Sequence, residues 1–416
     1  MEVHKILTPT ILLLATMDTK GSEALYLRDT LKGLGAKPLI IDLSTRYGDP
    51  ALRPEIPADD VAEAAGSSLD ILSGSRDMAA NMETVVNGAA SIARRLVNEG
   101  KAGGVIGIGG YTGTLMITAV LQSLPFGLPK VMVSSAAALP GLSNQFLKTS
   151  DIMLFHSVIE ISGLSDPVKN VLERAACALC GMLRGPVVDP TIDKERAVAM
   201  TMMSPCEKCA RAVRLALEKE GYQVIGFHAA GIGDRAMEDM VGAGLFRGVI
   251  DLAPGGVGEH LYGFMRDAGP DRLETAGKMG IPQIVSTCSV NHITPSRSEA
   301  RAEYRGRRKY DLDAFRTWIR MTPKELGEVA EIFAAKLNKS TGPVRVLVPL
   351  RGWSSVDSLG SPTYDPEEDG IFVRRLRETL KKEIEITEVD ANMEDPEFAR
   401  AVTSAACDLL RIGALK

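Results

Sequence analysis

A glycine-rich stretch in the first half of the chain decides the fold, and it reads Lys101-Ala102-Gly103-Gly104-Val105-Ile106-Gly107-Ile108-Gly109-Gly110-Tyr111-Thr112-Gly113-Thr114. Its apolar residues are typical of a short buried strand, and the later glycines lead into a helix. Glycine leaves no Cβ between backbone N–H groups and a ligand, and a helix start adds unpaired amides and a positive dipole end. The pattern G-x-G-G-x-x-G-T therefore indicates a phosphate or carboxylate site. The alternative is a tight strand-to-helix turn that needs glycine only for packing.

The composition restricts the class of protein. The chain has 416 residues, of which 45% are hydrophobic and 24% charged, as expected for a globular protein of two or three domains. The net charge of -5 argues against a nucleic-acid partner or an anionic membrane surface. The chain begins Met1-Glu2-Val3 and its first apolar run covers only Ile11 to Ala15. We therefore expect no signal peptide, no membrane span and a cytoplasmic location.

Two cysteine pairs have the spacing of zinc ligands. They are Cys177-x-x-Cys180 and Cys206-x-x-Cys209. The first pair lies in an apolar helical stretch and neither pair lies in a glycine-rich knuckle, so buried thiols are favoured over a structural zinc site. Cys206 follows Ser204-Pro205 at a predicted helix start, a position that lowers the pKa of a thiol.

Strands and helices alternate through both halves of the chain. The clearest break between the halves is the glycine- and proline-containing segment Arg184-Gly185-Pro186-Val187-Val188-Asp189-Pro190, and the alternation of strands and helices restarts after it. The sequence therefore predicts an α/β protein of two Rossmann-like, doubly wound domains, residues 1–185 and 190–416, which face each other across a cleft. Expected strands lie at residues 8–16, 38–42, 130–134, 152–156, 197–202, 223–227, 248–252, 283–286 and 344–349, and a further strand ends at Ile108 before the glycine-rich turn.

A basic segment interrupts this alternation between Pro295 and Tyr310. It carries Arg297, Arg301, Arg305, Arg307, Arg308 and Lys309 with little apolar periodicity. A solvated loop or dimer arm and an anion-binding lid are both compatible with this pattern.

Six motifs, taken in order, resemble the ATP-binding domain family named for the tomato mosaic virus resistance protein. The resemblance runs nearly end to end and implies two Rossmann-like subdomains, ATP bound on the first of them, and a dimer. The motifs are residues 16–23, 107–114, 156–158, 227–233, 268–274 and 349–354.

The resemblance also implies which residues lie near the phosphates. Residue chemistry agrees, because Lys20 offers a point charge, Asp18 can hold Mg²⁺, and threonine hydroxyls can donate to phosphate oxygens. The alternative for Asp18 and Thr19 is that they only cap the following helix. The implied phosphate-binding residues are Asp18, Thr19, Lys20, Gly109, Gly110, Thr112, Gly113 and Thr114.

The second half departs from the family pattern in two places, residues 251–260 and 287–292. Apolar residues and glycines replace hydroxyl-bearing ones there, which removes hydrogen-bond donors. A different ligand in the second domain is one interpretation. The residues that would supply a new constellation are Glu259, His260, Asn291 and His292.

Three functions remain open. The first is a small-molecule nucleotide-binding protein. The second is a hydrolase or lyase acting on a small carboxylate or carbonyl compound in the cleft, where His228 moves a proton, Arg235 and Arg351 hold the carboxylate, and Glu238 orients one of these cations. The third is an assembly subunit that only binds a partner protein.

Overall fold

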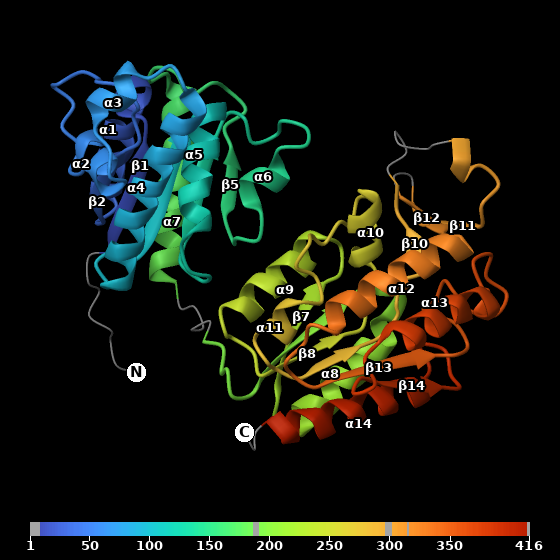
Figure 1. Cartoon of the computed structure of the whole chain (residues 1–416). Coiled ribbons are helices and arrows are strands. Elements are labelled where there is room, and N and C mark those ends of the chain that lie inside the picture. The colour runs from blue at the N-terminus through green and yellow to red at the C-terminus, as the bar shows by residue number, and fades with distance from the viewer. Residues whose placement is uncertain (1–8, 186–190, 296–301, 314–315, 414–416) are drawn as a thin grey trace. The chain divides into compact units, whose positions relative to one another are not determined.

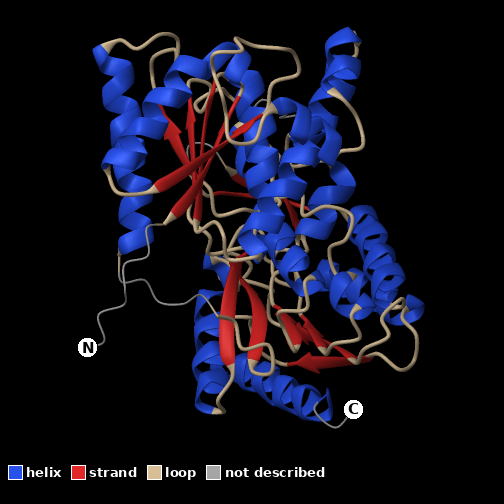
Figure 2. Ribbon diagram, turned by 90° about the vertical axis from the view of Figure 1, so that its left-hand side faces the viewer, coloured by secondary structure: helices blue, strands red, loops and turns tan. Residues whose placement is uncertain are grey.

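The computed structural model describes residues 9–185, 191–295, 302–313 and 316–413. The chain divides into two compact units, residues 1–190 and 191–416, and the boundary falls at the end of the glycine- and proline-rich segment. In each unit helices cover both faces of a parallel sheet (Figure 1; Figure 2). This confirms the predicted α/β architecture of two doubly wound units. That the units face each other across a cleft stays a prediction.

Unit 1 is built on a five-stranded parallel sheet of order β2-β1-β3-β4-β5. Every residue from Ile11 to Ala15 in β1 is buried, because α1 and α7 cover one face of the sheet and α2, α4 and α5 cover the other. The elements are β1 (Thr10–Ala15), α1 (Met17–Gly33), β2 (Lys37–Asp42), α2 (Ala58–Ala64), α3 (Leu69–Gly74), α4 (Met78–Asn98), β3 (Gly104–Gly109), α5 (Tyr111–Gln122), β4 (Lys130–Ser134), α6 (Ser143–Leu147), β5 (Met153–His156) and α7 (Asp166–Arg184).

The strand order of unit 1 reverses between β1 and β3. The chain leaves β1 toward β2 on one side, whereas it leaves β3 toward β4 on the other. In open parallel sheets this reversal leaves a crevice beyond the carboxyl ends of the two strands, and ligands bind there. The loops that follow β1 and β3 are therefore the part of unit 1 in which a ligand site is expected.

Unit 2 contains a six-stranded parallel sheet of order β14-β13-β9-β8-β6-β7 and a small antiparallel sheet of order β10-β12-β11, which the sequence did not predict. Helices α8 and α14 pack on one face of the large sheet. The elements are β6 (Ala197–Met202), α8 (Glu207–Lys219), β7 (Gln223–His228), α9 (Ile232–Gly242), β8 (Gly248–Asp251), α10 (Gly256–Tyr262), α11 (Thr275–Lys278), β9 (Gln283–Val285), β10 (His292–Ile293), β11 (Lys309–Asp311), β12 (Thr317–Arg320), α12 (Pro323–Leu337), β13 (Val344–Pro349), α13 (Pro366–Thr379), β14 (Glu385–Val389) and α14 (Pro396–Gly413), with short 3₁₀ turns at Ser204–Cys206 and Ala302–Tyr304.

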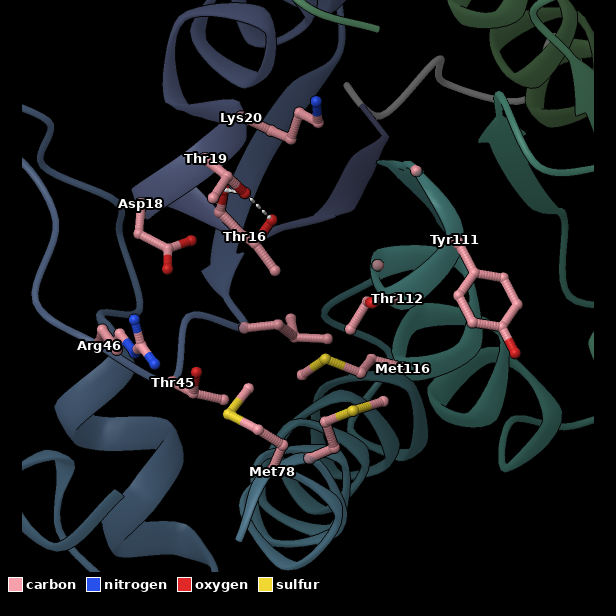
Figure 3. Close-up of a pocket in the computed structure, with 14 residues that line it drawn as sticks. Thr16, Asp18, Thr19, Lys20, Thr45, Arg46, Met78, Tyr111, Thr112 and Met116 are labelled. Atoms are coloured by element: carbon pink, nitrogen blue, oxygen red, sulfur yellow. Dashed lines mark hydrogen bonds between the residues drawn. The ribbon is translucent and has the colours of Figure 1, made fainter. Parts of the chain in front are cut away.

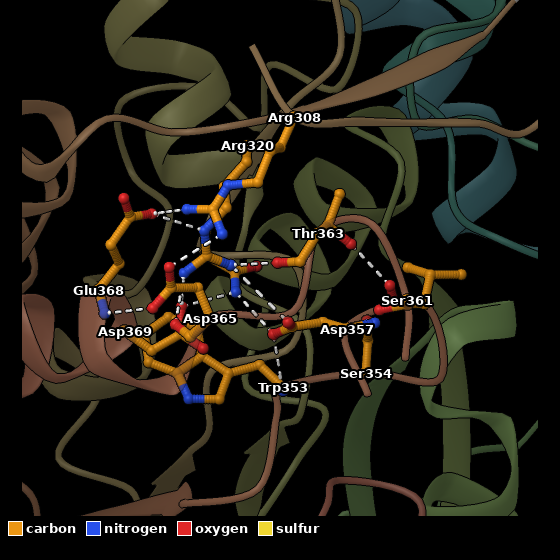
Figure 4. Close-up of polar contacts among 12 residues, drawn as sticks. Arg308, Arg320, Trp353, Ser354, Asp357, Ser361, Thr363, Asp365, Glu368 and Asp369 are labelled. Atoms are coloured by element: carbon orange, nitrogen blue, oxygen red, sulfur yellow. Dashed lines mark hydrogen bonds and ion pairs between the residues drawn. The ribbon is translucent and has the colours of Figure 1, made fainter. Parts of the chain in front are cut away.

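A buried polar network joins the small sheet to α13 (Figure 4). Arg320 of β12 donates to Asp369 of α13 at 2.6 Å, and the Asn291 side-chain amide donates to Asp369 at 2.9 Å and to Asp357 at 2.8 Å. Asp369 is only 3% exposed. Its burial, reinforced by the nearby Asp357 carboxylate, raises the pKa of Asp369 to about 8, so this carboxyl is largely protonated at neutral pH.

This raised pKa makes the stability of the protein depend on pH. Between about pH 4 and pH 8 the folded chain keeps a proton on Asp369 that the unfolded chain, with an aspartate pKa of about 4, has already released. The contribution of Asp369 to the free energy of unfolding is therefore present below pH 4 and is lost as the pH rises through 8. Urea unfolding should show that the free energy of unfolding falls less between pH 5 and pH 7.5 in Asp369→Asn than in the parent chain. The asparagine mimics the protonated acid at both pH values. An equal decline in both proteins would contradict this assignment.

Candidate functional site

A cavity of about 460 Å³ opens at the carboxyl ends of β1, β2 and β3 in unit 1 (Figure 3). It lies where the strand order reverses. Its lining comes from the β1–α1 loop, the segment after β2, the first turns of α4 and the start of α5. The lining residues are Thr16, Asp18, Thr19, Lys20, Leu43, Thr45, Arg46, Met78, Met82, Gly110, Tyr111, Thr112, Gly113 and Met116.

The start of α1 is fixed by the carboxyl end of β2. The buried Asp42 carboxylate accepts the Met17 N–H at 3.0 Å and a 2.5 Å hydrogen bond from the Ser44 hydroxyl. The Ser44 oxygen in turn accepts the Asp18 N–H at 3.0 Å. Burial raises the pKa of Asp42 even though these donors stabilise its charged form. The backbone around Asp18 is therefore held in place from β2.

The side chain of Asp18 is free to act on a ligand. The N-cap of α1 is Thr16, so neither Asp18 nor Thr19 occupies the capping position that the alternative interpretation requires. The Thr16 and Thr19 hydroxyls lie 2.7 Å apart and pair with each other. Asp18 is exposed, and its carboxylate points into the cavity (Figure 3). One carboxylate beside bound phosphates is the usual protein contribution to a Mg²⁺ site.

The two central glycines of the turn have different roles. A Cβ on Gly109 would lie 3.0 Å from the Cα of Gly113, so a side chain there would crowd the backbone of the turn. Gly110 is the N-cap of α5 with an ordinary φ of -80°, and a Cβ there would come no closer than 3.5 Å to any protein atom beyond its chain neighbours. The fold therefore does not require glycine at 110. No side chain of the described residues caps α5, so the first amides of this helix are open toward the cavity.

Two residues that the resemblance implies as phosphate ligands are engaged within the protein. The Thr114 hydroxyl is buried, bonds the Gly110 carbonyl at 2.7 Å and the Ser134 hydroxyl at 2.6 Å, and does not line the cavity. The Lys20 ammonium donates to the Ile161 carbonyl and lies 3.6 Å from the Glu160 carboxylate. The stem of Lys20 lines the cavity while its charge points away from it (Figure 3).

A cation that was not predicted from the sequence lies at the cavity. Arg46 is exposed, lines the cavity and forms no ion pair with any described residue. Thr45 and three methionines were missed as well. The available signal was position, because residues after β2 reach the same sheet edge as those after β1 and β3.

The structure does not assemble the four residues predicted for the second half. His228 ends the edge strand β7, while Arg351 follows β13, four strands away in the sheet and about 19 Å distant. Arg351 pairs with Asp390 at 2.5 Å on the surface. Glu238 orients neither Arg235 nor Arg351, because its buried carboxylate bonds Arg272 and backbone N–H groups instead. The prediction that Glu238 orients one of the two substrate-binding arginines is therefore wrong.

Arg272 forms the buried centre of unit 2. Its guanidinium is fully buried and contacts the carboxylates of Asp234, Glu238 and Asp251. Removing one partner from such a group is strongly destabilising, because it leaves an unpaired buried charge. Glu238 therefore has a structural role.

The residues of the two departing segments lie near one another, because Arg266 donates both to Glu259 and to the His292 carbonyl, but their side chains are engaged in different contacts. Glu259 pairs with the buried Arg266 at 2.6 Å, and Asn291 belongs to the Arg320 network. His292 is buried, and desolvation together with Arg320 lowers its pKa to about 3, so it is neutral. His260 is 40% exposed, and its Nδ1 lies 2.8 Å from Asp267, whose same oxygen lies 3.1 Å from Arg235.

Three other sequence hypotheses can be placed on the structure. Cys206, Cys209 and Cys288 are buried in the core, and no cluster of three metal-binding side chains occurs among the described residues. In the basic segment, Arg307 pairs with Glu325, and Arg308 pairs with Asp365 and Glu368, whereas Arg297 and Arg301 lie outside the described residues. Within the described ranges, no helix combines the length and the apolarity that crossing a bilayer requires.

Comparisons with known proteins give a family for both units. The chain is 34% identical over 403 residues to a UPF0261 protein of Clostridium tetani, covering 96% of this chain and 98% of the relative. It is 29% identical to the ToMV resistance protein Tm-1(GCR237) of Solanum lycopersicum, covering 97% of this chain and 56% of that protein. A UDP-N-acetylglucosamine 2-epimerase structure from Rickettsia bellii aligns over 98% of both chains with 8% identity and a TM-score of 0.24.

The family match covers most of the chain in two adjoining parts. Residues 9–187 match the N-terminal domain of an uncharacterised protein family, UPF0261, and residues 195–410 match its C-terminal domain. The chain therefore belongs to the UPF0261 family.

Proposed function

We propose that unit 1 binds a nucleotide, ATP with Mg²⁺, in the cavity at the carboxyl ends of β1, β2 and β3. The observation that carries this proposal is the open N-terminus of α5 at the point where the strand order reverses. Backbone N–H groups and a helix dipole aimed into a polar cavity favour a phosphate. A cavity of about 460 Å³ also lies within the size range of small-molecule sites.

Three side chains around the cavity would contact the phosphates or the Mg²⁺ ion in different ways. Thr112 lines the cavity beside the open amides, so its hydroxyl is available to donate to a phosphate oxygen (Figure 3). The unpaired Arg46 supplies a guanidinium that can grip phosphate oxygens through two hydrogen bonds. Asp18 supplies a carboxylate for a Mg²⁺ ion shared with the phosphates.

The resemblance to the ATP-binding domain family supports an adenine nucleotide as the ligand. We also retain Lys20 as a phosphate-binding residue. Its ammonium is held by one carbonyl and by the Glu160 carboxylate, which is 62% exposed. The exposure of Glu160 weakens this ion pair, although the Lys20 side chain is only 15% exposed, so Lys20 can turn toward a phosphate once it leaves the Ile161 carbonyl. Assembly into a homodimer, which the same resemblance implies, stays a prediction.

Gly110→Val tests the phosphate site directly. Calorimetry should show binding of Mg-ATP to the full chain, and the valine should weaken it more than tenfold, or about 1.4 kcal/mol, because its side chain fills the approach to the α5 amides. The fold has room for a side chain at 110, so the protein should still fold, with an unfolding temperature lowered only slightly by the poorer N-cap residue. Gly181→Val, at an exposed position of α7 with open space around it, is the matched control and should bind normally. Unchanged affinity in a folded Gly110→Val protein would refute the proposal.

A second candidate function is proton transfer on a small carboxylate in unit 2. It is favoured by the arrangement in which Asp267 holds both His260 and Arg235. The hydrogen bond at Nδ1 leaves Nε2 of His260 to take up a proton, and Arg235 beside it can hold a carboxylate. His260 replaces His228 in this version of the enzyme hypothesis.

Histidine NMR separates this candidate from a surface ion pair. Millimolar pyruvate, used as the carboxylate probe, should shift the His260 ring resonance in the parent chain. Arg235→Gln should abolish the shift because the carboxylate loses its partner. A His260 chemical shift that stays unchanged on addition of pyruvate would exclude the second candidate function.

A further inference from the structure

One end of the unit 1 cavity is apolar, and the phosphate site does not explain it. Leu43, Met78, Met82 and Met116 line this end, which we call the methionine wall. Figure 3 shows Met78 and Met116 gathered on the side away from the paired hydroxyls of Thr16 and Thr19. The cavity thus combines a polar end suited to phosphates with an apolar end suited to a different chemical group.

The methionine wall leaves apolar surface uncovered. Leu43 and Met116 belong to the core and are at most 2% exposed. Met78 is 45% exposed and Met82 is half-buried, although both stand on the first turns of α4 beside a cavity lined by charged residues. Methionine sulfur and methyl groups make favourable contacts with aromatic rings, and a flat heteroaromatic ring would cover this surface.

We propose that the methionine wall binds the base of the nucleotide and accepts adenine and guanine alike. This inference rests on the proposed function, because it presupposes phosphates at the start of α5. It goes beyond that function in assigning the site a purine-nucleotide class rather than ATP alone.

We expect no strong selection between adenine and guanine because of the side chains near the methionine wall. Thr45 supplies the polar side-chain group beside Met78 in the cavity (Figure 3), and its hydroxyl has no hydrogen-bond partner among the described residues. A hydroxyl both donates and accepts, so it can pair with the 6-amino group of adenine or the 6-oxo group of guanine. Strong selection between bases requires a buried group that the wrong base leaves unpaired. Flexible methionines also adapt to either ring.

Calorimetry with three probes tests the inference on the full chain. Mg-ATP and Mg-GTP should bind with affinities within about threefold of each other. Met78→Ala should weaken both nucleotides about tenfold, as expected for lost apolar contact with the base. The same variant should leave the affinity for inorganic tripolyphosphate unchanged, because that probe has no base. Met153→Ala, which removes a methionine of similar exposure on β5 outside the cavity, should change none of the three affinities.

The outcomes separate this inference from the proposed function. If tripolyphosphate and ATP bind but GTP binds more than about thirtyfold more weakly, the base-tolerant wall is refuted and the phosphate site stands. If Met78→Ala and Met82→Ala both leave ATP affinity unchanged, the base lies elsewhere and the inference is again overturned. If none of the three probes binds, the proposed function fails and the inference fails with it.

Discussion

The reversal of strand order between β1 and β3 is the constraint on which the unit 1 site depends. Parallel strands need crossover helices, and the helices that follow β1 and β3 diverge toward opposite ends of the sheet. The space between their N-termini cannot be filled by either connection. Asp42 at the end of the neighbouring strand then holds the start of α1 by accepting the Met17 N–H.

Unit 2 has a reversal of the same kind between β6 and β8, and the backbone is closely packed there. Gly255 and Gly256 begin α10 in close contact with their surroundings: a Cβ on Gly255 would lie 2.3 Å from the Ser289 carbonyl oxygen, and one on Gly256 would lie 2.5 Å from the Ala268 side chain. The buried guanidinium of Arg272 also pairs with Asp251, the last residue of β8. The two units therefore share a strand order but differ at the start of the helix after the second strand of the reversal: a Cβ on Gly255 or Gly256 would clash with its surroundings, whereas a Cβ on Gly110 would not.

Regular elements could be predicted from the sequence where both faces of a strand are buried. The bounds predicted for β4, β6 and β13 match the structure because their continuous apolar runs leave little choice. The antiparallel sheet β10-β12-β11 escaped prediction, since its strands are two to four residues long and lie in or beside the basic segment. Site residues that neighbour each other in sequence were found together, as in the turn around Gly110. Arg46 and the methionines were missed because only the tertiary fold brings them to the same cavity.

The most direct test of the central claim is a crystal structure of the full chain with Mg-ATP. Our account predicts phosphate oxygens within about 3 Å of the backbone N–H groups at the start of α5, with Mg²⁺ near Asp18. Nucleotide density in unit 2, or phosphates bound away from Tyr111, Thr112 and Gly113, would contradict it.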